Sequence, residues 1–155
     1  MLRVTSIDEG FSEEQKDKLR RGLDAANAVL PSEEFRSAIL ALRNLTETED
    51  SPEEIFRKLT TAEIAIPIRS YTAKIPWSRA IASERDGEIF YNLRRFDALT
   101  LRDLVENLIH EASHKVGYRH RSNFASRSWN TVPYQVGRAA AAAGDALNLW
   151  KGDLE

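Results

Sequence analysis

Three apolar runs in the first sixty residues have helical spacing, and each follows a polar residue that can cap a helix. The capping residues are Ser12, Ser32 and Ser51, and Gln15 and Glu54 complete capping boxes after the first and third of them. The apolar stripe of the first helix consists of Leu19, Leu23, Ala26 and Leu30. The pattern therefore predicts three helices in this part of the chain.

Alternation of apolar and polar residues begins after Thr61 and indicates strands. Residues 62–71 alternate and are rich in β-branched side chains, but Pro67 has no N–H to donate, so we expect an edge or broken strand. The Asp86-Gly87 pair suits a two-residue type I′ turn, and the runs on either side of it predict an antiparallel hairpin.

A long amphipathic helix is predicted from Thr100 to Val116. Thr100 and Asp103 form a capping box, and Gly117 is typical of the position just beyond a helix end. The apolar stripe of this helix consists of Leu101, Leu104, Val105, Leu108, Ile109, Ala112 and Val116. After a loop of polar and aromatic residues, a final helix is expected at about 133–150.

The order of these elements is helices, then a small mixed or antiparallel sheet, then helix–loop–helix, which is an α+β layout. A chain of 155 residues fits a single domain. We therefore expect one domain over 1–155, in which a helical segment of residues 1–60 packs on a core of residues 61–155.

Composition and charge narrow the classes of partner. The formal net charge is -2 and the pI is about 6.0, which gives no reason to expect nucleic acid or an anionic membrane as a partner. The chain has no cysteine, so disulfides and thiolate metal sites are excluded. The N-terminal stretch contains no long apolar run, so we expect neither a signal peptide nor a membrane span. The expected location is the cytoplasm, with secretion as an open alternative, and nothing indicates the oligomeric state.

All three histidines of the chain lie between Leu108 and His120. His110 and His114 are four residues apart on the predicted helix, so their Cβ atoms are about 5–6 Å apart and two imidazoles can converge on one metal ion. Both lie on the helix face opposite the apolar stripe. Glu111 is adjacent to this face, near enough to reach a metal-bound water without being a ligand itself.

Gly117 allows the chain to turn back after the helix, because glycine readily adopts the left-handed conformation. His120 then follows three residues later as a third candidate ligand. Three neutral imidazoles and one water make up a catalytic zinc site, in which one position stays open. We therefore expect Zn²⁺ as the cofactor, although another divalent ion that accepts three imidazoles fits the same ligands.

The pattern H-E-x-x-H-x-x-G-x-x-H resembles the zinc-binding signature of the metzincin metallopeptidases. With typical residue frequencies, its chance occurrence is on the order of 10⁻⁷ to 10⁻⁸ per start position. The resemblance implies a zincin-like fold and a zinc metallopeptidase that cleaves a peptide or protein substrate. It implies that His110, His114 and His120 hold Zn²⁺ and that Glu111 is the catalytic base.

The resemblance also implies a strand shortly before the zinc helix with which an extended substrate pairs. Residues 87–92 are the candidate, and the substrate groove would then be lined by Ile89 to Asn92.

One element departs from the metzincin pattern. Metzincins have a methionine turn beneath the metal, whereas the only methionine of this chain is Met1. Val132 or Pro133 would stand in its place. In some metzincins a tyrosine just after that turn reaches the zinc or the oxyanion, and Tyr134 is the candidate for that catalytic role here.

Other interpretations of the three histidines stay open. They could be exposed imidazoles on a polar helix face, or a structural zinc site, which would need a fourth protein ligand. The missing methionine turn and the short loop after His120 suggest a second function class, a zinc-binding or toxin-like module on a zincin scaffold without proteolysis. In a third, the N-terminal helices are the working surface and zinc only stabilises the fold.

Overall fold

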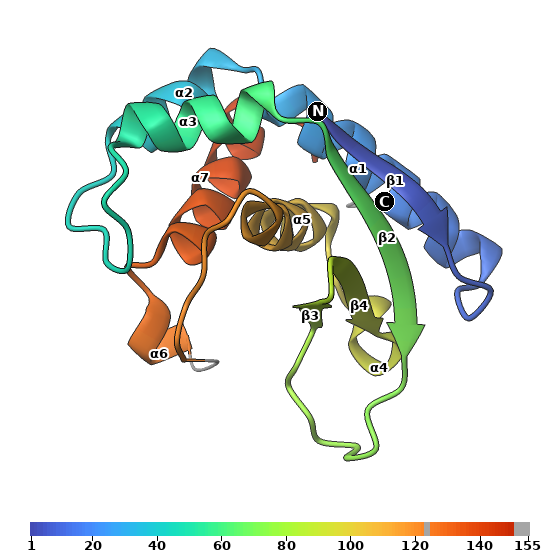
Figure 1. The fold of residues 1–155 in the computed structure, drawn as a ribbon. Helices are drawn as coiled ribbons and strands as arrows, with labels where there is room; N and C mark the ends of the chain where they lie inside the picture. Colours follow the sequence, from blue (N-terminus) through green and yellow to red (C-terminus); the bar gives the residue numbers. More distant parts are fainter. Residues whose placement is uncertain (123–124, 151–155) are drawn as a thin grey trace.

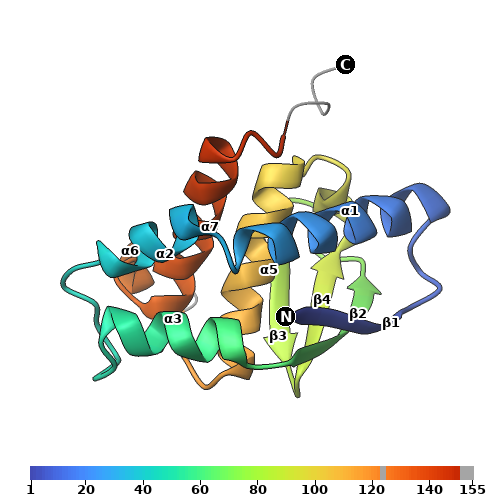
Figure 2. The same cartoon turned by 90° about the horizontal axis from the view of Figure 1, so that it is seen from above.

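The computed structural model describes residues 1–122 and 125–150, and one side of it is formed by a four-stranded mixed sheet (Figures 1 and 2). The strand order is β1-β2-β4-β3. The β1–β2 and β2–β4 pairs are parallel, and the β3–β4 pair is antiparallel. The strands are β1 (Leu2–Ile7), β2 (Ile64–Tyr71), β3 (Ala82–Arg85) and β4 (Glu88–Asn92).

The first strand corrects the expectation that the first sixty residues are helical throughout. β1 pairs along β2, with Leu2 opposite Ile64, and the side chain of Leu2 is only 1% exposed. The segment therefore joins the sheet. Its β-branched residues favour a strand, but a single strand becomes stable only with a partner that lies about sixty residues away.

The second strand is internal, so the expectation of an edge or broken strand around Pro67 was wrong. Pro67 lies opposite Ser6, at the point where the register of β1 shifts between Val4 and Ser6. A bulge of this kind leaves the ladder locally unpaired, and a proline, which has no N–H to donate, is tolerated there.

The hairpin at Asp86-Gly87 is confirmed. Both residues have positive φ, 53° and 80°, as a type I′ turn requires, and Arg85 pairs with Glu88 across it. β4, however, lies between β2 and β3. The prediction that residues 89–92 line a substrate groove at the sheet edge is therefore wrong, because Ile89, Tyr91 and Asn92 are fully buried. The strand of this hairpin that lies at the sheet edge is β3.

The helices are α1 (Glu13–Val29), α2 (Glu33–Leu40), α3 (Pro52–Thr61), α4 (Leu93–Phe96), α5 (Leu101–Lys115), α6 (Ala125–Ser128) and α7 (Val132–Ala146). Helices α1 and α5 lie against the sheet, and α2, α3 and α7 lie beyond α5, away from the sheet (Figures 1 and 2). The capping boxes at Ser12, Ser51 and Thr100 are confirmed. The last helix ends earlier than expected, because Asn148 adopts a left-handed conformation with φ 55° that stops it at Ala146.

Helix α5 lies at the centre of the molecule, against α7 on one side and against α1 and the sheet on the other (Figure 2). A Cβ atom on Gly137 of α7 would lie 2.6 Å from the backbone oxygen of Glu106 and 3.3 Å from Cβ of His110. The absent side chain therefore brings α7 against the part of α5 that carries His110. No helix in the described ranges is both long and apolar enough to cross a lipid bilayer.

Candidate metal centre

The three histidines converge on one point. The ring centroids of His110 and His114, one turn apart on α5, are 5.2 Å apart, and that of His120 lies 5.4 and 4.9 Å from them, respectively. Their candidate ligand atoms all lie within 4.8 Å of one another. The Nε2 atoms of His110 and His120 are 3.4 Å apart. Tetrahedral zinc with Zn–N bonds of about 2.0–2.1 Å separates two ligand nitrogens by about 3.3 Å, so this pair already has the spacing of a zinc site.

The turn that returns His120 to the helix depends on Gly117. Its φ is 106°, a value that residues with a side chain rarely adopt. The N–H of Gly117 donates to the His114 carbonyl at 3.1 Å, and the N–H of Tyr118 donates to the Ser113 carbonyl at 3.1 Å. These two bonds are the Schellman pattern of a helix end. The expected glycine reversal is therefore present.

The tautomer of His114 is fixed by its surroundings. Its Nδ1 lies 2.8 Å from the carbonyl oxygen of Tyr118, which can only accept, so the neutral ring carries its proton on Nδ1. The lone pair is then on Nε2. Metal-binding histidines are commonly oriented by such a bond to a carbonyl.

Burial keeps two of the imidazoles neutral. It lowers the pKa of His110 to about 3, with the charges of His114 and His120 acting in the same direction. Burial also lowers the pKa of His114, although the hydrogen bond to the Tyr118 carbonyl opposes that shift. Neutral rings at pH 7 are the form that binds a metal ion.

Glu111 is a buried carboxyl group on the same helix, with 4% of its surface exposed. Burial raises its pKa to about 8, the charge of Glu84 adds to that rise, and a hydrogen bond from the Glu84 backbone opposes it. Within the described residues, its Oε2 atom has no hydrogen-bond partner. The backbone of Glu84 in β3 thus hydrogen-bonds to the Glu111 carboxyl group, and Oε2 of that group stays free to bind another molecule.

Tyr134, in the first turn of α7, lies against the histidines. Its ring centroid is 4.6 Å from that of His110 and 5.3 Å from that of His120. Burial raises the pKa of its hydroxyl, and the charge of Glu111 raises it further. The structure therefore places Tyr134 beside His110 and His120 of the histidine cluster, and its catalytic role stays a prediction. Val132 and Pro133, which stand where a methionine turn would fall, are buried at the start of the same helix.

Several residues around this site carry no signal in the sequence. Glu84 and Tyr118 contact Glu111 and His114 through backbone atoms, and a pattern of side chains does not predict such contacts. Glu47 and Asp50 contact the loop of His120 from positions about seventy residues away in the chain.

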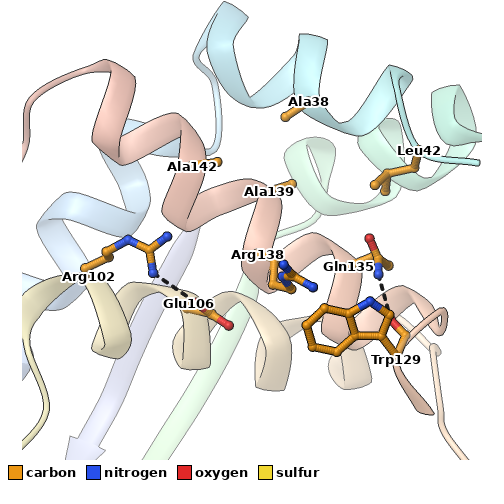
Figure 3. Close-up of a pocket in the computed structure, with 9 residues that line it drawn as sticks. All are labelled: Ala38, Leu42, Arg102, Glu106, Trp129, Gln135, Arg138, Ala139 and Ala142. Carbon is orange, nitrogen blue, oxygen red and sulfur yellow. Dashed lines mark hydrogen bonds and ion pairs between the residues drawn. The ribbon is translucent and has the colours of Figure 1, made fainter. Parts of the chain in front are cut away.

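A hollow of about 420 Å³ lies between α2, α5 and α7 (Figure 3). In it the guanidinium of Arg138 stacks 3.7 Å from the centre of the Trp129 ring, and Arg102 pairs with Glu106. Neither the three histidines nor Glu111 line it, so it is separate from the candidate metal centre. Its lining consists of Ala38, Leu42, Arg102, Glu106, Trp129, Gln135, Arg138, Ala139 and Ala142.

The chain matches no model of a protein family, and neither a curated protein nor a solved structure matches it. What is known of the site therefore rests on its own geometry, a cluster of three histidines that could bind a metal ion.

Proposed function

We propose that this protein is a zinc-dependent metallopeptidase of minimal, metzincin-like build. The observation that carries the proposal is the convergence of His110, His114 and His120, with their candidate ligand atoms within 4.8 Å, beside a buried carboxyl group with an unpaired oxygen. Among the described residues, the cluster includes no fourth histidine or carboxylate. A site with three protein ligands keeps a position open for water or substrate, which favours a catalytic over a structural role.

The three histidines would hold Zn²⁺ through neutral imidazoles, with His114 using Nε2 because its Nδ1 donates to the Tyr118 carbonyl. When bound, zinc lowers the pKa of a water towards 7 and polarises a carbonyl group. With Zn²⁺ bound, the nearby positive charge would lower the pKa of Glu111 below its metal-free value of about 8. As a carboxylate, Glu111 would take a proton from the attacking water on its open oxygen and deliver it to the leaving amine nitrogen. Tyr134 would donate a hydrogen bond to the oxyanion that develops on the scissile carbonyl.

The substrate would be a peptide in extended form. β3 is the edge of the sheet, and its residue Glu84 donates a backbone hydrogen bond to Glu111. An extended peptide that adds to this edge would run beside the carboxyl group and the histidines. In this proposal the strand that pairs with the substrate is β3, and not residues 87–92 as we first expected.

The proposal is tested by metal analysis of the purified protein and digestion of a peptide library, with and without chelator. One bound zinc per chain and cleavage that stops on chelation and returns with zinc support it. Zinc binding without cleavage of any peptide across a range of pH supports the alternative, a non-proteolytic zinc-binding module. The presence of Val132 and Pro133 in place of a methionine favours that alternative.

A further inference from the structure

The loop of residues 41–51, which joins α2 to α3, holds both ends of the segment that carries His120. The hydroxyl of Tyr118 donates to Oδ2 of Asp50 at 2.6 Å. The backbone N–H of Arg121 donates to Oε2 of Glu47 at 3.0 Å. His120 therefore lies between two residues that are each tied to a carboxylate of the same loop.

Tyr118, one of the two residues bound to this loop, also contacts a second histidine, His114. Tyr118, which Asp50 holds by its hydroxyl, accepts the Nδ1 hydrogen bond of His114 on its carbonyl oxygen at 2.8 Å. The guanidinium of Arg119 donates to the carbonyl groups of Tyr118 at 3.1 Å and His114 at 2.6 Å, and so ties the same turn together. The position of Tyr118 thus sets the orientation of His114 as well as the path of the chain to His120.

The same loop contacts the start of α7. The N–H of Thr46 donates to the carbonyl of Asn130 at 2.9 Å, and Thr46 forms an isolated parallel bridge with Thr131, the residue that caps α7. Tyr134 lies in the first turn of that helix. The loop therefore touches the two segments that bring His120 and Tyr134 to α5.

The backbone of the loop is in an uncommon conformation where its carboxylate acts. Glu47 has φ 60°, in the left-handed region that glutamate rarely adopts, and Asn44 has φ 57° in the same loop. Such a conformation persists where the surrounding contacts hold it, and it is enriched at functional sites. At Glu47 it accompanies the bond from its carboxylate to the Arg121 N–H. Asn44 makes no side-chain hydrogen bond to another described residue, so it supplies a matched control.

We propose that the 41–51 loop is a clamp that positions His114 and His120 for metal binding, with Glu47 and Asp50 as its two positioning residues. This inference rests on the metal centre of the proposed function, and it is independent of whether that centre hydrolyses peptides. The loop between α2 and α3 would then help to set the zinc affinity, although all three proposed ligands lie about sixty residues or more further along the chain.

The first test is Glu47→Gly, measured by zinc affinity in competition with a chromogenic chelator. Glycine removes the carboxylate but adopts positive φ without strain, so the melting temperature of the metal-free protein should stay within about 3 °C. Zinc affinity should fall about ten-fold, the lower end of the effect of residues that orient metal ligands. Glu47→Gln keeps an acceptor oxygen and should restore the affinity to within about two-fold of wild type. Asn44→Gly, the control for backbone freedom, should leave it unchanged.

The second test is Tyr118→Phe, which removes only the hydroxyl that Asp50 holds. It should weaken zinc binding about ten-fold and change the visible absorption of the cobalt-substituted protein, because the geometry of His114 and His120 changes. Zinc affinity within about two-fold of wild type in both Glu47→Gly and Tyr118→Phe, with wild type binding zinc, overturns the clamp alone. Failure of the wild-type protein to bind zinc overturns the clamp and the metal centre together.

Discussion

The carbonyl oxygen of Tyr118 accepts a hydrogen bond from Nδ1 of His114 at 2.8 Å, across the turn that Gly117 makes. This contact is one of those that join the helix that carries two histidines to the loop that carries the third. It also fixes the proton on Nδ1 and leaves the Nε2 lone pair for a metal ion. The end of helix α5 thus orients the His114 ring in the absence of a metal ion.

Zinc should stabilise the folded protein. A ligand that binds only the folded state adds about 2.7 kcal/mol at one hundred times its dissociation constant, which for a domain of this size raises the melting temperature by about 5–10 °C. Thermal unfolding with and without added zinc measures this. His114→Ala removes a ligand and should abolish the increase; an equal increase in this variant would show that zinc acts elsewhere on the chain.

Gly117→Ala should disrupt the site through the backbone. A Cβ atom at Gly117 would meet no other atom within 4 Å, so its cost comes from the φ of 106° and not from a clash. That cost is about 1–2 kcal/mol, measurable by denaturant unfolding of the metal-free protein, and zinc affinity should fall as well. Gly117→Asn should lose less stability and less zinc affinity than Gly117→Ala, because asparagine tolerates positive φ better. Equal behaviour of alanine and glycine here would contradict the argument.

Much of this arrangement could be predicted from the sequence, because it depends on neighbouring residues. The capping box at Thr100, the hairpin at Asp86-Gly87 and the Gly117 turn involve side chains or backbone preferences within a few positions of one another. Two of the features that were predicted wrongly depend on distant partners. β1 is stable only beside β2, and Pro67 is accommodated by a bulge in β1, neither of which a local pattern reveals.

The contacts around the site show the same limit. The spacing of His110, His114 and His120 is a local pattern, and the prediction that they cluster is confirmed. Glu47 and Asp50, in contrast, contact residues on either side of His120 across sequence separations of 74 and 68 residues. As exposed or half-exposed acids in a polar loop, they look in the sequence like ordinary surface residues.

Asp50 should make the free energy of unfolding depend on pH in the acidic range. Hydrogen bonds from Lys58 and then Tyr118 lower the pKa of Asp50 below its usual value. A carboxylate with a depressed pKa in the folded state contributes stability that is present above its unfolded pKa and is lost as pH falls through the folded value. The metal-free wild type should therefore be more stable than Asp50→Asn at pH 7, and the difference should shrink below about pH 4. A difference in unfolding free energy that stays constant from pH 7 to pH 3 would contradict this role for its charge.

The most direct test of the central claim is Glu111→Gln, assayed in parallel for bound zinc and for peptide hydrolysis. Glutamine keeps the size of the side chain but cannot take a proton from water, so we expect one zinc per chain, as in wild type, and loss of hydrolysis by at least about a hundred-fold. Hydrolysis at the wild-type rate by the zinc-loaded variant would contradict the assignment of Glu111 as the base, and with it the proposed mechanism.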